Sequence, residues 1–211
     1  MTLSDTPPIT TLLFDFGGVL VRTQSRQTRL RWDTRLGQLP GTGERLLLES
    51  THSRATQRGE IAEAVHWEWV RQQLGLTPLG LAHFRHDFFA DDLATPIIPW
   101  LAKLHTHYRI GLLSNFWGSV RDWLGELGVL DCFDDVVFSA EVGFAKPDPR
   151  IYTLALSRLA CQPRQALFID DFEHNLAPAR QLGMHTLLAD ARGEWVETLV
   201  NLYSSNNKIG S

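Results

Sequence analysis

The stretch LLFDFGGVL, residues 12–20, decides how this chain folds. Its apolar run is too short for a helix and is bounded by turn residues, so it predicts a buried strand. The run lacks polar alternation, which is typical of a strand covered on both faces in a parallel sheet. Ligands of open α/β sheets bind beyond the carboxyl ends of the strands, and Asp15 follows such an end. Because an aspartate there is also a common turn residue, this stretch alone leaves the function open.

The two glycines of this stretch, Gly17 and Gly18, allow the backbone to turn sharply and to approach a ligand closely. Strands and helices then alternate along the second half of the chain. Expected strands are 109–113, 136–139, 166–169 and 185–189, and expected helices are 96–107, 119–127, 149–160, 175–182 and 193–203. This alternation predicts parallel strands joined by right-handed crossovers. We therefore expect an α/β fold with a doubly wound, mainly parallel, Rossmann-like sheet.

Between the first two strands of this sheet lies a segment, residues 24 to 93, without a convincing strand. Within it, Ile61, Val65 and Trp69 recur every four residues, which indicates a helix. Further helices are expected over 24–37, 42–54 and 78–90. The segment therefore predicts a helical bundle over the strand ends. We expect residues 1–22 and 94–211 to form a discontinuous α/β core, and residues 23–93 to form a helical cap.

Composition narrows the classes of function. The 211 residues carry a formal net charge of −4, which argues against nucleic-acid binding because that usually requires a basic face. Since the sequence has no apolar run of about eighteen residues and no visible secretory signal, we expect no membrane association and a cytoplasmic location. The two cysteines do not make a disulfide framework.

Polar residues gather at the predicted strand ends. Asp15, Ser114–Asn115 and Asp170–Asp171 follow three different strands, and Lys146 lies in a loop on the same side. Neighbouring carboxylates repel each other unless a cation joins them. Carboxylate and carbonyl oxygens suit Mg²⁺, which readily shares a phosphate. Together with a lysine and a hydroxyl, these residues predict a phosphoryl-transfer site.

Four stretches carry a family resemblance: FDFGGVL (14–20), LLSN (112–115), KPDPRIY (146–152) and FIDDFEHN (168–175). In this order they resemble the haloacid dehalogenase superfamily, in particular its phosphatase-like branch with a helical cap. The similarity spans about residues 11 to 183. Within this superfamily, the four stretches are similar to those of sugar-phosphatase-like members and of the phosphatase-like N-terminal domain of soluble epoxide hydrolases. The resemblance implies a hydrolase of small phosphorylated metabolites.

The resemblance also implies a catalytic group and a magnesium site. Asp15 would be the nucleophile and would form an aspartyl phosphate. Mg²⁺ would be held by Asp15, by the main-chain carbonyl of Gly17 and by Asp171, which precedes Asn175 by the four residues seen in relatives. Asp170 and Asn175 would then orient Asp171 and hold waters.

Further roles fall on the phosphate-binding residues. The resemblance implies that Ser114 donates a hydrogen bond to the transferring phosphate and that Lys146 bridges Asp15 and phosphate. Gly17, Gly18 and Asn115 complete the expected substrate-binding set.

One residue departs from the family pattern. Relatives with ordinary phosphatase activity usually carry a second Asp two residues after the nucleophile, which protonates the leaving group, whereas this chain has Gly17. General acid–base catalysis is typically worth about 10²–10⁴ in rate. We therefore expect slow or leaving-group-selective hydrolysis, with acyl phosphates or anomeric sugar phosphates favoured because they need least protonation.

Two other functions remain open at this point. A metal-independent 2-haloacid dehalogenase would use the same Asp15 to attack carbon, although the paired Asp170–Asp171 would then serve no purpose. A non-catalytic phosphate-binding or regulatory protein would explain Gly17. The sequence leaves open which metabolite is bound and whether the chain is a monomer or a homodimer.

Overall fold

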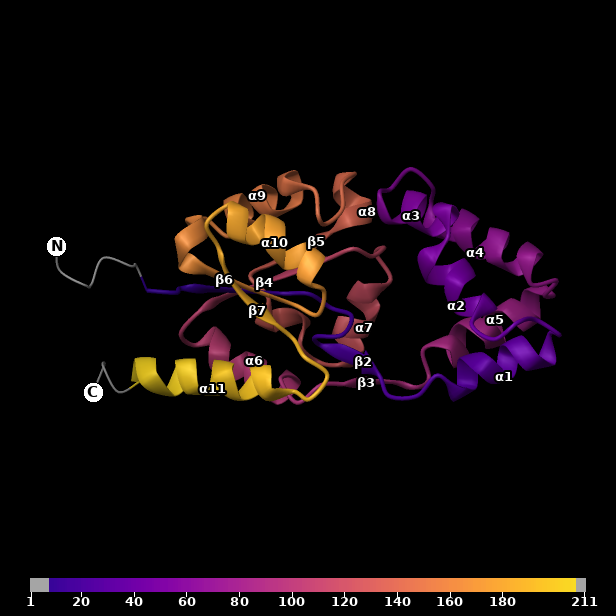
Figure 1. Ribbon diagram of the computed structural model, residues 1–211, viewed down its shortest axis with the longest axis horizontal. Coiled ribbons are helices and arrows are strands. Elements are labelled where there is room, and N and C mark those ends of the chain that lie inside the picture. Colours follow the sequence, from indigo (N-terminus) through magenta and orange to yellow (C-terminus); the bar gives the residue numbers. More distant parts are fainter. Residues whose placement is uncertain (1–7, 208–211) are drawn as a thin grey trace.

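The computed structural model describes residues 8–207 of the chain, with a five-stranded sheet at its centre (Figure 1). The strands are β1 (Thr11–Phe14), β4 (Arg109–Ser114), β5 (Asp135–Phe138), β6 (Ala166–Asp170) and β7 (His185–Leu188). Their order is β5-β4-β1-β6-β7, and every neighbouring pair is parallel. The α/β prediction is therefore confirmed. Because β4 and β6 flank β1, the residues that follow these three strands meet at one edge of the sheet.

Helices cover both faces of the sheet (Figure 1). One face carries α6 (Ile98–His105), α7 (Val120–Glu126) and α11 (Glu194–Asn207), and the other carries α9 (Pro149–Arg158) and α10 (Glu173–Gln181). Alternate residues of β1 serve the two layers: Leu12 and Phe14 pack with the first group, and Leu13 packs with the second. Each such burial contributes about 1.5–3 kcal/mol. Short elements complete this part: α8 (Ser139–Val142), η2 (Leu130–Cys132) and η3 (Pro163–Gln165).

A separate group of helices lies beyond the carboxyl ends of the strands, and we call it the cap (Figure 1). It consists of α1 (Gln27–Arg35), α2 (Thr42–Glu44), the π-helical η1 (Arg45–Glu49), α3 (Thr51–Gln57), α4 (Glu63–Gln73) and α5 (Pro78–Phe88). The cap has its own apolar cluster, which includes Leu47, Val70 and Phe84. Trp117, from the loop after β4, is buried in the same cluster. The loop that follows Ser114 therefore anchors the cap on the sheet.

Two details differ from the sequence expectations. The single helix expected over 42–54 is broken at Ser50, whose backbone is extended and whose side chain accepts a hydrogen bond from the amide of Ser53 to cap α3. The segment expected to lack strands also contributes to a two-stranded antiparallel ribbon, β2 (Val21–Thr23) with β3 (Asp92–Ala94). Strands of three residues are too short to show an alternating pattern. This ribbon carries the chain between the sheet and the cap.

No helix in the described part of the chain, residues 8–207, combines the length and the apolar character that crossing a lipid bilayer requires.

Candidate active site

Two buried carboxylates and one buried ammonium group lie at the centre of the sheet edge. The Lys146 Nζ atom is 2.9 Å from Asp15 Oδ1 and 2.7 Å from Asp170 Oδ2. The side chain of Lys146 is 1% exposed and that of Asp170 is fully buried. A buried charge without a partner is costly, so this lysine and these carboxylates depend on each other. Asp15 follows β1 and Asp170 ends β6, and the parallel pairing of the two strands brings them together.

Asp170 and Asn115 hold this unit in place. Both oxygens of Asp170 are occupied: Oδ1 accepts hydrogen bonds from the amide of Phe172 and from Asn175 Nδ2, and Oδ2 accepts from Asn175 Nδ2 and Lys146 Nζ. Asn115 makes two hydrogen bonds to the main chain of Lys146: its Nδ2 donates to the carbonyl at 2.7 Å, and its Oδ1 accepts from the amide at 2.7 Å. The loop with Lys146 is thus fixed to the end of β4.

Asp171 stands apart from this hydrogen-bond network. Its Oδ1 atom is buried and has no hydrogen-bond partner. One carboxylate oxygen from each of Asp15, Asp170 and Asp171 lies within 4.8 Å of the others, the one such acidic cluster found among the described residues. Three acidic groups at this spacing, one with an unpartnered buried oxygen, fit a divalent cation with oxygen ligands.

Gly18 makes the position of Asp171 possible. The φ angle of Gly18 is +75°, and a Cβ atom there would lie 2.1 Å from Asp171 Oδ2. Any side chain at this position would displace the carboxylate. Gly17 differs, because its backbone is not left-handed and a Cβ atom there would meet nothing within 4 Å. The position at which relatives usually carry the second Asp therefore has open space around it.

Burial raises the pKa values of the Asp15 and Asp171 carboxyls. Burial raises the pKa of Asp15 to about 6, with Lys146 lowering it and Asp170 raising it. Burial, together with the charges of Asp15 and Asp170, raises the pKa of Asp171 to about 7. Burial alone would lower the pKa of Lys146, but the two neighbouring carboxylates raise it above its usual value. The site therefore holds more negative charge than one lysine neutralises.

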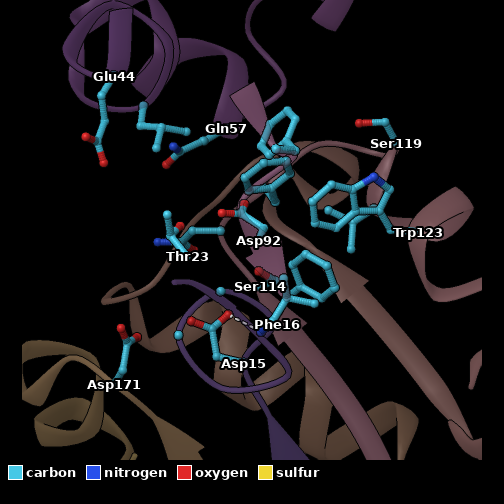
Figure 2. A pocket seen from close by; sticks show the side chains of 18 of the residues that line it. Asp15, Phe16, Thr23, Glu44, Gln57, Asp92, Ser114, Ser119, Trp123 and Asp171 are labelled. Atoms are coloured by element: carbon cyan, nitrogen blue, oxygen red, sulfur yellow. Dashed lines mark hydrogen bonds between the residues drawn. The ribbon is translucent and has the colours of Figure 1, made fainter. Parts of the chain in front are cut away.

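A cavity of about 920 Å³ opens above Asp15, between the strand ends and the cap. It is lined by eight of the nine residues singled out in the sequence: Asp15, Gly17, Gly18, Ser114, Asn115, Lys146, Asp171 and Asn175. The ninth, Asp170, lies beneath them with no exposed surface. Figure 2 shows Asp15 beside Ser114 at the base, with Asp171 on one side and Phe16 and Trp123 on the other.

Other residues of the cavity carry no sequence signal. Phe89 and Trp123 both line it, from the end of α5 and from α7. Arg29, at the start of the cap, is 6% exposed. Its guanidinium donates hydrogen bonds to the carboxylates of Asp92 and Glu44. Their periodic placement in helices predicts only core or surface positions, so sequence reasoning missed them.

Comparison with known proteins assigns the chain to a protein family. Residues 9–183 match the family model of the haloacid dehalogenase-like hydrolases. The chain belongs to this family, and it is a hydrolase. The hydrolase is 25% identical over 213 residues to D-ribitol-5-phosphate phosphatase from Bacteroides thetaiotaomicron, covering 93% of this chain and all of that protein. It also resembles a HAD family enzyme from the same organism, solved with magnesium and inorganic phosphate, at a TM-score of 0.72 and 25% identity, covering 85% of this chain and 93% of the other.

Another relative of the hydrolase shares only a segment. Bifunctional epoxide hydrolase 2 of Mus musculus is 39% identical over 82 residues, which are 36% of this chain. The match spans 15% of the length of that relative. The activity of the whole relative therefore says nothing direct about this hydrolase.

Proposed function

We propose that the hydrolase is a Mg²⁺-dependent phosphatase of small phosphorylated metabolites, which acts through an aspartyl phosphate on Asp15. The observation that carries the proposal is the Asp15–Lys146–Asp170 unit with the unpartnered oxygen of Asp171 beside it. An anionic nucleophile accepts a phosphoryl group only where fixed positive charge offsets the repulsion between the two. The relative named for a sugar-alcohol phosphate and the relative solved with magnesium and phosphate support this choice.

Asp15 is positioned for attack on phosphorus. The amide of Phe16 donates to Asp15 Oδ1 at 2.7 Å, and Lys146 Nζ contacts the same oxygen at 2.9 Å. We assign the attack to Oδ2, since these contacts hold Oδ1. A bond then forms between Asp15 Oδ2 and phosphorus, and the bond from phosphorus to the leaving oxygen breaks with its electron pair on that oxygen.

The second half of the reaction regenerates Asp15. Water attacks phosphorus, the bond from phosphorus to Asp15 Oδ2 breaks, and its electron pair returns to the carboxylate. The proton lost by the water passes to solvent. Lys146 stays bound to Asp170 throughout and presents its charge to Asp15 and to the phosphoryl oxygens, while the Ser114 hydroxyl donates to one of them.

The donor set fits a magnesium ion. Asp15, Asp171 and the main-chain carbonyl of Gly17 would hold it, whereas the oxygens of Asp170 are already engaged by Lys146, Asn175 and the amide of Phe172. When bound, Mg²⁺ supplies positive charge that neutralises the phosphoryl group. Asn175 and Asp170 act by fixing Lys146 and the start of α10.

The cap and Gly17 set selectivity in this proposal. Residues 23–93 close the cavity over Asp15, and residues 1–22 and 94–211 supply the reacting groups. Without a side chain at Gly17 to protonate the leaving oxygen, esters with weakly basic leaving groups react fastest.

The test is phosphate release from a panel of acyl, sugar and alkyl phosphates, with and without Mg²⁺. We expect Mg²⁺-dependent turnover of at least one ester, and its loss by about 10⁴-fold or more in Asp15→Asn, the scale for removing a catalytic nucleophile. Turnover that is indifferent to this substitution would overturn the proposal. Halide release from 2-haloacids in EDTA would instead show a dehalogenase.

A further inference from the structure

The cavity above Asp15 has one aromatic wall, built from three separate segments. Phe16 follows the nucleophile, Phe89 follows the last turn of cap helix α5, and Trp123 lies on α7. The ring centroids of Phe16 and Trp123 are 5.8 Å apart, and those of Phe89 and Trp123 are 5.1 Å apart at an interplanar angle of 81°. These are the geometries in which aromatic rings attract each other. The wall is therefore a packed surface that spans the boundary between sheet and cap.

This wall has free surface inside the cavity. Phe16 is buried, but Phe89 and Trp123 are only partly buried and line the cavity. Phe116, also partly buried, extends the wall from the loop after Ser114. A leaving group that extends into the cavity from a phosphoryl group at Asp15 would cover this surface, which favours an apolar, flat group.

The wall stands beside the reacting carboxylate. Figure 2 shows Phe16 and Trp123 on one side of Asp15, and Asp171 on the opposite side. Phe16 is the residue next to Asp15, and its amide donates a hydrogen bond to Asp15 Oδ1, so the position of this part of the wall is tied to the nucleophile.

A second, independent observation comes from Gly17. Its open space holds no group that protonates a leaving oxygen. A phenolate leaves without such help more readily than an alkoxide, since the pKa of a phenol is about 10 and that of water, to which simple alcohols are close, is about 15.7. The chemistry at Gly17 and the shape of the wall thus favour one kind of ester.

We propose that the preferred substrates are small aryl phosphates, whose phosphate oxygen is bonded directly to an aromatic ring that packs against Trp123 and Phe89. This inference rests on the phosphatase function proposed above. In the first step the bond from phosphorus to the aryl oxygen breaks, its electron pair leaves on a phenolate, and Asp15 takes the phosphoryl group. No proton has to be supplied before the bond breaks.

The test measures hydrolysis, in the presence of Mg²⁺, of substrates in which the aromatic ring and the quality of the leaving group vary independently. The substrates are phenyl phosphate, benzyl phosphate (a ring with an alkoxide leaving group), acetyl phosphate (a good leaving group without a ring), ethyl phosphate and glucose 1-phosphate. We expect the highest kcat/KM with phenyl phosphate. Trp123→Leu should raise KM for phenyl and benzyl phosphate about 10-fold relative to acetyl phosphate, the scale of an aromatic contact of about 1.4 kcal/mol. Trp123→Phe, which keeps a ring, should recover most of this loss.

Two controls accompany these variants: one checks that each variant is folded, and the other tests the wall with a substitution at a different residue. Thermal melts of each variant show whether it is folded, and Phe89→Leu tests the other half of the wall without changing a residue of α7. If acetyl phosphate or glucose 1-phosphate is preferred, or if Trp123→Leu and Phe89→Leu affect every ester equally, the aryl inference is wrong while the phosphatase function stands. If no ester is hydrolysed, the proposed function itself fails and the inference fails with it.

Discussion

The floor and the wall of the cavity are built in opposite ways. The floor consists of Asp15, Lys146, Asp170 and Asp171, which are charged, largely buried and held by strand ends. The wall consists of the aromatic rings of Phe16, Phe89 and Trp123, which pack on one another and on neighbouring apolar side chains of the core and the cap. In the proposed function, the floor would act on any phosphate ester, whereas the wall would select among them. Substitutions in the floor should alter kcat or stability for every substrate, and substitutions in the wall should alter KM for some.

The largest expected change comes from Gly17, where floor and wall meet. Gly17→Asp places a carboxyl group in open space, and we expect a gain of about 10²–10⁴ in kcat for benzyl and ethyl phosphate, the range of general acid–base catalysis. The gain should be much smaller for phenyl phosphate, because a phenolate needs little protonation. Steady-state rates for the three esters measure it. Equal gains for all three would show that leaving-group protonation is not what the site lacks.

Next in size is the loss of the buried cation in the floor. Lys146→Met leaves two neighbouring carboxylates without their partner, and we expect a loss of about 3–5 kcal/mol in the free energy of unfolding. Urea denaturation measures this loss. The matched variant Lys146→Met with Asp170→Asn removes one of the charges and should recover part of the stability. If Lys146→Met costs less than about 1 kcal/mol, the floor is not held by these ion pairs.

The two adjacent glycines give a matched pair of smaller effects. Gly18→Ala forces a side chain into the left-handed region at a φ of +75° and against Asp171, so we expect a loss of at least about 1–2 kcal/mol in stability. Gly17→Ala meets open space and should change stability by less than about 1 kcal/mol, in the stabilising direction. Parallel urea titrations compare the two. Equal losses would contradict the proposed packing of Asp171 over Gly18.

The smallest expected effect concerns pH and magnesium. The pKa values of Asp15, about 6, and Asp171, about 7, lie above the ordinary value of 3.8. The folded metal-free protein therefore binds these protons more tightly than the unfolded chain. Their stabilising contribution is complete below about pH 3.8 and is lost as the pH rises to about 7. Since Mg²⁺ binds the ionised carboxyls, millimolar Mg²⁺ should raise Tm by about 3–6 °C at pH 8 and by much less at pH 5.

Thermal melts at both pH values check this expectation, with Asp171→Asn as the control. This variant removes the carboxyl with the higher pKa, so it should lose most of the magnesium-induced rise at pH 8. A rise of equal size at pH 5 and pH 8, or one that survives in the variant, would place the metal elsewhere.

The contrast between floor and wall also explains which parts of the site can be predicted from the sequence and which cannot. Asp15, Asp170 and Asp171 lie at the ends of buried strands, and parallel pairing brings Asp15, Ser114 and Asp170 to one edge, whereas Lys146 comes from the loop between α8 and α9. Local patterns therefore predict the sheet and the cluster. The wall arises because Phe89, directly after cap helix α5, packs against Trp123 of α7, and no local pattern encodes that approach. Phe89 and Trp123 look like ordinary helix residues until the cap is in place. The ribbon β2–β3 depends in the same way on a contact between distant segments, whereas the break at Ser50 comes with a local cap of α3.

The most direct test of the account is to look for a phosphoryl group on Asp15. The enzyme, in excess over phenyl phosphate and with Mg²⁺, is quenched in acid within the first turnover, and its peptides are analysed by mass spectrometry. We predict one added phosphoryl group on the peptide with Asp15, which decays as phosphate appears and is missing in Asp15→Asn. Release of phosphate with no phosphorylated peptide at any time, or phosphate on another residue, would contradict it.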